Sequence, residues 1–191
     1  MTDLILVWDA ATSPDPLPDD AIGTACMVYV GGTSAARVWT EPEIDRVAHM
    51  PKLPVWVPTP GVDNPRQAGH ACIAALQARG ITPVNSQGQR QWVLVDLETG
   101  REPAADWLKV FVRPIFQAGY SIPRYGSPDS SHLFDYTPGT VGYWVANFNG
   151  QARLYNHANV VGTQFQDLVR TPGGIVDQSV MLPTGLPHLW V

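Results

Sequence analysis

The sequence is poor in charged residues and has no run of basic residues. Aspartate, glutamate, lysine and arginine together make up 15% of its 191 residues, and the formal net charge is -5. No run of lysine or arginine is present, although binding to nucleic-acid phosphates or to anionic lipids generally depends on such runs. We therefore expect neither nucleic acid nor a membrane surface as a partner.

Long hydrophobic runs are absent as well. No apolar stretch approaches the roughly 20 residues that a transmembrane helix needs. The N-terminus also lacks a basic region followed by the apolar core of a signal peptide. We therefore expect no membrane span and no signal peptide, and we expect synthesis in the cytoplasm.

The sequence offers little material for metal or cofactor chemistry. Its two cysteines, Cys26 and Cys72, lie in apolar segments without the spacing of metal ligands, so we expect two buried thiols. The histidines, at positions 49, 70, 132, 157 and 188, show no zinc-binding spacing. A G-x-S-x-G elbow, a P-loop and a G-x-G-x-x-G motif after the first strand are all missing. We expect no metal and no cofactor, and acyl transfer and nucleotide chemistry lack their usual motifs.

Short apolar segments rich in β-branched residues alternate with helix-like segments along most of the chain. The expected strands are residues 4–8, 26–30, 53–57, 91–98, 120–125, 141–148, 160–165 and 175–180. Helices are expected from the capping-box pair Thr40 and Glu43 onward, over 66–79 and over 103–116. Pro114 is expected to kink or end the last of these. This alternation is typical of βα units around a parallel sheet.

These segments predict an α/β protein with one domain over residues 1–191. About eight parallel strands fit a (β/α)8 barrel of the TIM type. The connections after the third helix are too short, or too rich in proline and glycine, for full helices. We therefore expect shortened helices in the second half of the barrel. An open doubly wound sheet is the alternative.

Two carboxylates stand at the end of the fourth expected strand. Period-2 alternation through residues 93–100 places Asp96 and Glu98 on the same face, and in a barrel they should point into the mouth. Two acids at such range push one pKa upward, which keeps one of them protonated as a general acid. Glu98 lies nearer the strand end and is the predicted acid. The alternative is that one acid caps the next helix and the other pairs with an arginine.

Two further acids lie in the first and last expected strands. Asp9 ends the first strand and Asp177 lies in the last one. A closed barrel brings these strands together, so both acids should lie near the mouth. Each acid alone would be an ordinary cap or turn residue. Four converging carboxylates without a metal instead favour cleavage of a glycosidic bond.

Several aromatic side chains lie in or at the ends of the expected strands, where they could form a floor on which a sugar ring stacks. The candidates for substrate binding are Trp8, Tyr29, Trp56, Tyr125 and Trp144, with Gln164 as a hydrogen-bond partner for a sugar hydroxyl or acetamide. The alternative is that most of these aromatic residues belong to the core and that Gln164 is an ordinary loop residue.

Six short motifs occur in an order that resembles a known family. They are Asp9 at its strand end, Asp96-Leu97-Glu98, Tyr125-Gly126-Ser127, Tyr143-Trp144-Val145-Ala146, Gly162-Thr163-Gln164-Phe165 and Val176-Asp177. In this order they resemble the glycoside hydrolase family 25 lysozymes. The run Tyr29-Val30-Gly31-Gly32 is similar to the related actinobacterial glycoside-hydrolase-like domains. The resemblance spans nearly the whole chain.

The resemblance implies N-acetylmuramidase activity on the glycan strand of peptidoglycan. Glu98 matches the general acid of the family, and Asp96, Asp9 and Asp177 match its supporting acids. Gln164-Phe165 departs from the more typical Trp-Gln-Tyr. Without a signal peptide, the resemblance implies a phage lysin, either released onto the cell wall or carried in the virion beside other tail proteins. The alternative is a catalytically weak glycan-binding or virion structural module on the same barrel.

Overall fold

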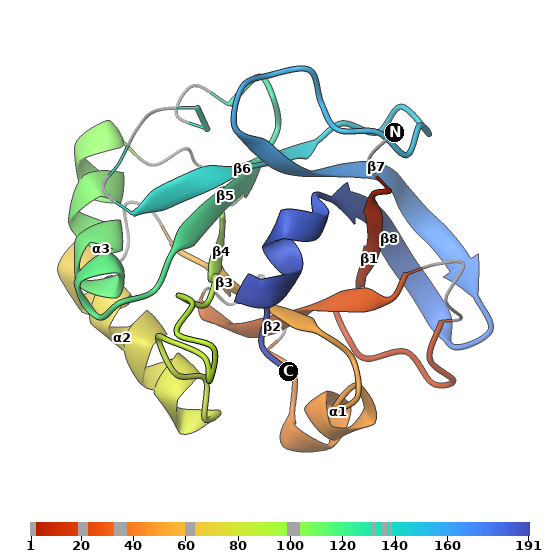
Figure 1. Ribbon diagram of the computed structural model, residues 1–191, viewed down its shortest axis with the longest axis horizontal. Helices are drawn as coiled ribbons and strands as arrows, with labels where there is room; N and C mark the ends of the chain where they lie inside the picture. The colour runs from red at the N-terminus through yellow and green to blue at the C-terminus, as the bar shows by residue number, and fades with distance from the viewer. Residues whose placement is uncertain are drawn as a thin grey trace.

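A closed barrel of eight strands forms the centre of the protein in the computed structural model (Figure 1). The structure describes residues 3–18, 23–32, 38–59, 64–98, 104–130, 133–134, 137 and 139–191. The strands follow one another around the barrel in chain order, and the last strand closes the ring against the first. The predicted α/β barrel is confirmed, and the alternative of an open sheet is wrong.

The elements match most of the expected segments. The strands are β1 (Ile5–Asp9), β2 (Ala25–Gly32), β3 (Lys52–Val57), β4 (Leu94–Asp96), β5 (Ile122–Gly126), β6 (Thr140–Ala146), β7 (Val160–Thr171) and β8 (Gly174–Met181). The helices are α1 (Glu41–Arg46), α2 (Pro65–Ala78), α3 (Ala105–Gln117) and the 3-10 helix η1 (Pro183–His188). β4 is much shorter than the predicted 91–98, and β7 extends well beyond the predicted 160–165.

The strand directions differ from the prediction at one place. β1 to β7 pair with one another in parallel, but β8 is antiparallel to both β7 and β1. β7 and β8 form a hairpin in which Thr171 pairs with Gly174. A parallel connection needs a crossover of about a dozen residues, whereas the link between these strands is a tight turn. The expectation of eight parallel strands is therefore wrong for the last one.

The helices cover only part of the barrel. α1 begins at the predicted capping box of Thr40 and Glu43, and α1 to α3 follow β2, β3 and β4. Among the described residues no α-helix follows β5, β6 or β7, which confirms the shortened second half. Pro114 lies inside α3 and does not end it. Within the described chain, no helix combines the length and apolar character needed to cross a membrane.

Two large hydrophobic layers, with a smaller cluster around Tyr143, Val145 and Val160, hold the barrel together. One fills its interior and includes Met27, Val55, Leu94 and Trp144. The other lies between the barrel and its helices and includes both cysteines, which are buried free thiols as predicted. Successive strand residues alternate between the two layers, as the pleat of a strand requires.

The C-terminal segment closes the base of the barrel. η1 crosses the barrel in Figure 1, and Trp92 stacks on His188 at 5.1 Å between ring centroids. Lys52 and Trp190 exchange two backbone hydrogen bonds at the start of β3, and Leu189 joins the interior layer. The N-terminal ends of the parallel strands are thus covered, which leaves their carboxyl ends for a site.

The close approach of β6 and β7 can be tested at Gly162. A Cβ atom at this position would lie 2.4 Å from the Trp144 ring, which is buried inside the barrel. We expect Gly162→Ala to lower the free energy of unfolding by about 1–3 kcal/mol, measured by urea unfolding, because the interior must shift to admit the methyl group. Gly126→Ala is the control, because its nearest contact would be an ordinary 3.6 Å. Equal stability of the two variants would contradict this packing.

Candidate active site

A cavity of about 450 Å³ opens at the carboxyl ends of the parallel strands. Its border includes the four predicted acids, Asp9, Asp96, Glu98 and Asp177, together with Tyr29. A much smaller void touches Asp9, Tyr29, Asp96 and Tyr125, so these side chains converge toward the barrel interior. The expected convergence of four carboxylates at the barrel mouth is therefore found in the structure.

Asp9 and Asp177 face each other across neighbouring strands. Asp9 is the last residue of β1, and it is in direct register with Asp177 of β8. The Leu168 backbone N–H donates to Asp177 Oδ1 at 2.9 Å, and the Tyr29 hydroxyl donates a long hydrogen bond of 3.4 Å to Asp9 Oδ1. Because β8 is antiparallel, its first half lies at the mouth. Asp177 reaches the site for this reason.

Asp96 and Glu98 mark the point where the chain leaves the sheet. Asp96 is the last residue of β4, and its Oδ1 accepts a hydrogen bond from the Glu98 backbone N–H at 2.8 Å. This Asx turn replaces the next pair of the strand ladder, which explains the early end of β4. Glu98 is consequently exposed at the rim, whereas Asp96 is half-buried.

The two deeper acids are the ones whose proton affinity changes most. Burial raises the pKa of Asp9 to about 8, and the charges of Asp177 and Asp96 add to this rise. Burial also raises the pKa of Asp96 to about 7, while the hydrogen bond from the Glu98 backbone lowers it. Asp9 therefore keeps its proton at neutral pH, and Asp96 is partly protonated and partly ionised.

The outer acids respond to the same forces. Burial of the carboxyl raises the pKa of Glu98, and contacts with Tyr125 and with the Ser127 backbone work against this rise. Burial likewise raises the pKa of Asp177, while hydrogen bonds from Leu168 and Gln164 lower it. The sequence predicted the raised pKa for Glu98; the structure places larger increases on Asp9 and Asp96, because they lie deeper.

Tyr125 and Gln164 link the acids behind the cavity. The Tyr125 hydroxyl donates a hydrogen bond to Gln164 Oε1, and Gln164 also bonds to Asp177. Tyr125 and Asp96 are register partners on β5 and β4. Gln164 is only 2% exposed, so it acts on the site through its neighbours. The predicted contact of Gln164 with a sugar is therefore wrong, and Gln164 instead supports Tyr125 and Asp177 from behind the cavity.

Three of the predicted stacking residues belong to the core. Trp8 is fully buried and stacks on Trp39 at 6.1 Å, and Trp56 lies in the same outer layer. Trp144 is fully buried inside the barrel, where its Nε1–H donates to Ser179 Oγ at 3.2 Å. The expectation that Trp8, Trp56 and Trp144 stack on a sugar is therefore wrong. Tyr29 borders the cavity, and Tyr125 reaches the void beneath it.

Apolar side chains that were not among the predicted site residues complete the cavity. Leu168 and Ile175 come from the β7–β8 hairpin and are 68% and 51% exposed. Val57 ends β3 beside them. Val57 could have been predicted as a cavity residue, because it lies at the end of a strand, as Asp9 does. The hairpin residues could be found only by recognising that β7 continues past residue 165.

The arrangement suits proton transfer. Acids at different depths of one cavity have unequal proton affinities, so one can donate a proton while another stays ionised. Among the described residues, no group of three or more histidine, cysteine, aspartate or glutamate side chains is arranged to hold a metal ion.

No protein-family model matches the sequence, and no curated protein sequence matches it. Solved structures share its fold. The catalytic domain of endolysin ply40 from bacteriophage P40 of Listeria monocytogenes is 14% identical, with 96% of each chain covered and a TM-score of 0.67. An uncharacterized protein from B. stearothermophilus is 17% identical, with 97% of this chain and 100% of that chain covered and a TM-score of 0.73.

A third structure is the modular autolysin LytC from Streptococcus pneumoniae, solved with a synthetic peptidoglycan ligand. It is 14% identical, with a TM-score of 0.64, and the match covers 93% of this chain but 46% of the autolysin. The fold is shared over nearly the whole chain. The resemblance to the family 25 lysozymes is therefore confirmed at the level of the fold.

The raised pKa of Asp9 predicts how stability depends on pH. The pKa in the folded protein, about 8, lies above the usual 3.8, so the folded state binds more protons between these values. The contribution of the Asp9 carboxyl to the free energy of unfolding is therefore greatest below about pH 4, and it is lost as the pH rises through 8. The free energy of unfolding of the wild type should therefore fall between pH 5 and pH 9. For Asp9→Asn, which cannot ionise at this position, we expect this fall to be smaller by roughly 1–3 kcal/mol.

Urea unfolding at pH 5, 7 and 9 measures this difference. Asp45→Asn is the matched control, because Asp45 is exposed on α1 and lies outside the cavity. This control should follow the wild-type curve. Parallel curves for wild type and Asp9→Asn would show that Asp9 ionises normally, which would contradict the buried acid cluster.

Proposed function

We propose that this protein is a glycoside hydrolase of the muramidase type, which cleaves the glycan strand of peptidoglycan. The observation that carries the proposal is the convergence of Asp9, Asp96, Glu98 and Asp177 on one cavity at the carboxyl ends of the barrel strands. Active sites of such barrels lie at this end, and glycosidic cleavage relies on paired carboxyl groups. The folds of an endolysin catalytic domain and of an autolysin solved with a peptidoglycan ligand support the same substrate.

Glu98 is the proposed general acid. It lies at the rim, where a leaving-group oxygen can reach it, and partial burial of its carboxyl raises its pKa. The contact with the Tyr125 hydroxyl works against this rise, so the proposed role depends on burial of the carboxyl and on the charge of Asp177, which both raise the Glu98 pKa. A raised pKa favours the protonated form that a general acid needs before it donates.

The other three acids support this step from their different depths. Asp96 fixes the Glu98 backbone through its Oδ1 and can place negative charge beneath the developing oxocarbenium ion. Asp177, held by Leu168 and Gln164, adds charge from the opposite strand. Asp9 keeps its proton at neutral pH and therefore supplies a hydrogen-bond donor rather than another repelling charge.

The cavity also offers surfaces that suit an N-acetylated sugar. Tyr29 presents an aromatic side chain beside the acids, and the exposed Leu168 and Ile175 form an apolar rim on the hairpin. An acetamide methyl or a lactyl group can lie on such a rim while hydroxyls face the carboxyl groups. This combination favours an amino-sugar polymer over an unsubstituted glucan.

The direct test is hydrolysis of purified peptidoglycan. We expect wild-type protein to release reducing ends, and Glu98→Gln to lower the rate by roughly 10²–10⁴-fold, because loss of a general acid costs that much. The free energy of unfolding should barely change, since Glu98 is exposed. Glu41→Gln, an exposed change on α1, is the matched control and should keep full activity.

Two outcomes would contradict the proposal. Wild-type protein that binds cell walls saturably but releases no reducing ends from several wall types would indicate a glycan-binding module. A Glu98→Gln variant with unchanged turnover would remove Glu98 from its proposed role.

A further inference from the structure

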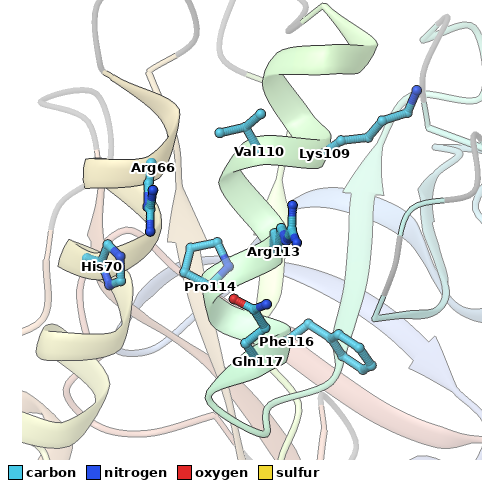
Figure 2. Close-up of a pocket in the computed structure, with 8 residues that line it drawn as sticks. All are labelled: Arg66, His70, Lys109, Val110, Arg113, Pro114, Phe116 and Gln117. Atoms are coloured by element: carbon cyan, nitrogen blue, oxygen red, sulfur yellow. The ribbon is translucent and has the colours of Figure 1, made fainter.

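A second concave surface lies on the outside of the barrel, over α2 and α3 (Figure 2). Its volume is about 740 Å³, which exceeds that of the acidic cavity. Arg66 and His70 border it from α2, and Lys109 and Arg113 border it from α3. We call this set of four side chains and the hollow between them the α2–α3 surface.

The α2–α3 surface is cationic in a chain whose net charge is -5. Within the part of the chain that the structure describes, no acidic side chain borders it. Among the described residues Arg66 and Arg113 have no carboxylate partner, while Lys109 forms an exposed pair with Asp106 at 3.4 Å. All four side chains are exposed. The surface can therefore attract an anion without first breaking a buried ion pair.

The spacing of these groups suits a repeated anion. Arg66 and His70 are four residues apart on α2, and Lys109 and Arg113 are four apart on α3. Residues with this spacing share one helix face and are separated by about 6 Å along it. Each helix thus offers two side chains with N–H donors, about one turn apart. The guanidinium groups can in addition bind phosphate with two parallel hydrogen bonds.

The apolar part of the surface narrows the choice of polymer. Val110 and Phe116 border the hollow, but the guanidinium of Arg90 covers the Phe116 ring at 4.9 Å. Binding of single-stranded nucleic acid relies on free aromatic faces on which bases stack. Apart from the imidazole of His70, no other aromatic side chain among the described residues borders this surface. A chain of phosphates without bases fits the lining better than an oligonucleotide does.

We propose that the α2–α3 surface binds a linear polyol phosphate, an unbranched chain of sugar alcohols joined by phosphodiesters. This inference rests on the proposed function, because polymers of this chemistry accompany peptidoglycan in many bacterial walls. The surface lies on the outer face of α2 and α3, apart from the residues that border the acidic cavity. A bound polyol phosphate would therefore hold the enzyme on the wall and leave the cavity free for the glycan.

The test is binding of the full chain to purified poly(glycerol phosphate), followed by calorimetry at low and high salt. We expect saturable binding that weakens as salt screens the charges. The double variant Arg66→Glu/Arg113→Glu should bind at least tenfold more weakly. Arg153→Glu/Arg170→Glu changes the net charge equally at exposed arginines outside the surface, and should bind within about threefold of wild type, since distant charges are screened. Arg66→Gln/Arg113→Gln repeats the test without introducing acidic groups.

Several results would overturn this inference. They are absence of binding by the wild type at low salt, an equal loss in both double variants, or tighter binding of an oligonucleotide or of phosphatidylglycerol vesicles at matched phosphate. Binding is measured without cleavage and can be repeated with Glu98→Gln. Failure to bind with intact hydrolysis would therefore remove only this inference. Failure to hydrolyse with intact binding would remove only the proposed function.

Discussion

The antiparallel pairing of β8 with β1 is the constraint on which the site depends. It closes the barrel, and it sets Asp177 directly opposite Asp9 at the mouth. A parallel last strand would direct its first half toward the base, which the C-terminal segment already covers. The tight β7–β8 hairpin therefore supplies both the fourth carboxylate and the apolar rim of Leu168 and Ile175.

Bringing four acids together carries an electrostatic cost. Ionised carboxylates in a partly buried cavity repel one another and lose hydration. The protein reduces this cost by keeping protons on the deep acids and by donating backbone N–H groups to Asp96 and Asp177. As a result, acids of one cavity differ in proton affinity, with the largest pKa increases at the buried Asp9 and Asp96. Unequal proton affinities are what acid–base chemistry at neutral pH requires.

Part of this site could be predicted from sequence. The strand-end positions of Asp9 and Asp96 and the closed barrel together placed the acids correctly. The alternation of side chains along β1 could also have shown that Trp8 does not face the cavity. A residue that directly precedes an inward-facing Asp9 must face outward. The direction of β8 and the contacts of Gln164 could not be predicted, because they depend on the hairpin and on packing between distant strands.

The most direct measurement of the acid cluster is a carboxyl-carbon NMR titration of protein labelled at aspartate and glutamate. We expect Asp9 to titrate near pH 8 and Asp96 near pH 7, since both are buried beside other carboxyl groups. We also expect Asp177→Asn to lower the Asp9 midpoint, because the charge of Asp177 contributes to the rise. Titration of both acids near pH 4, unaffected by this substitution, would contradict a shared carboxylate cavity.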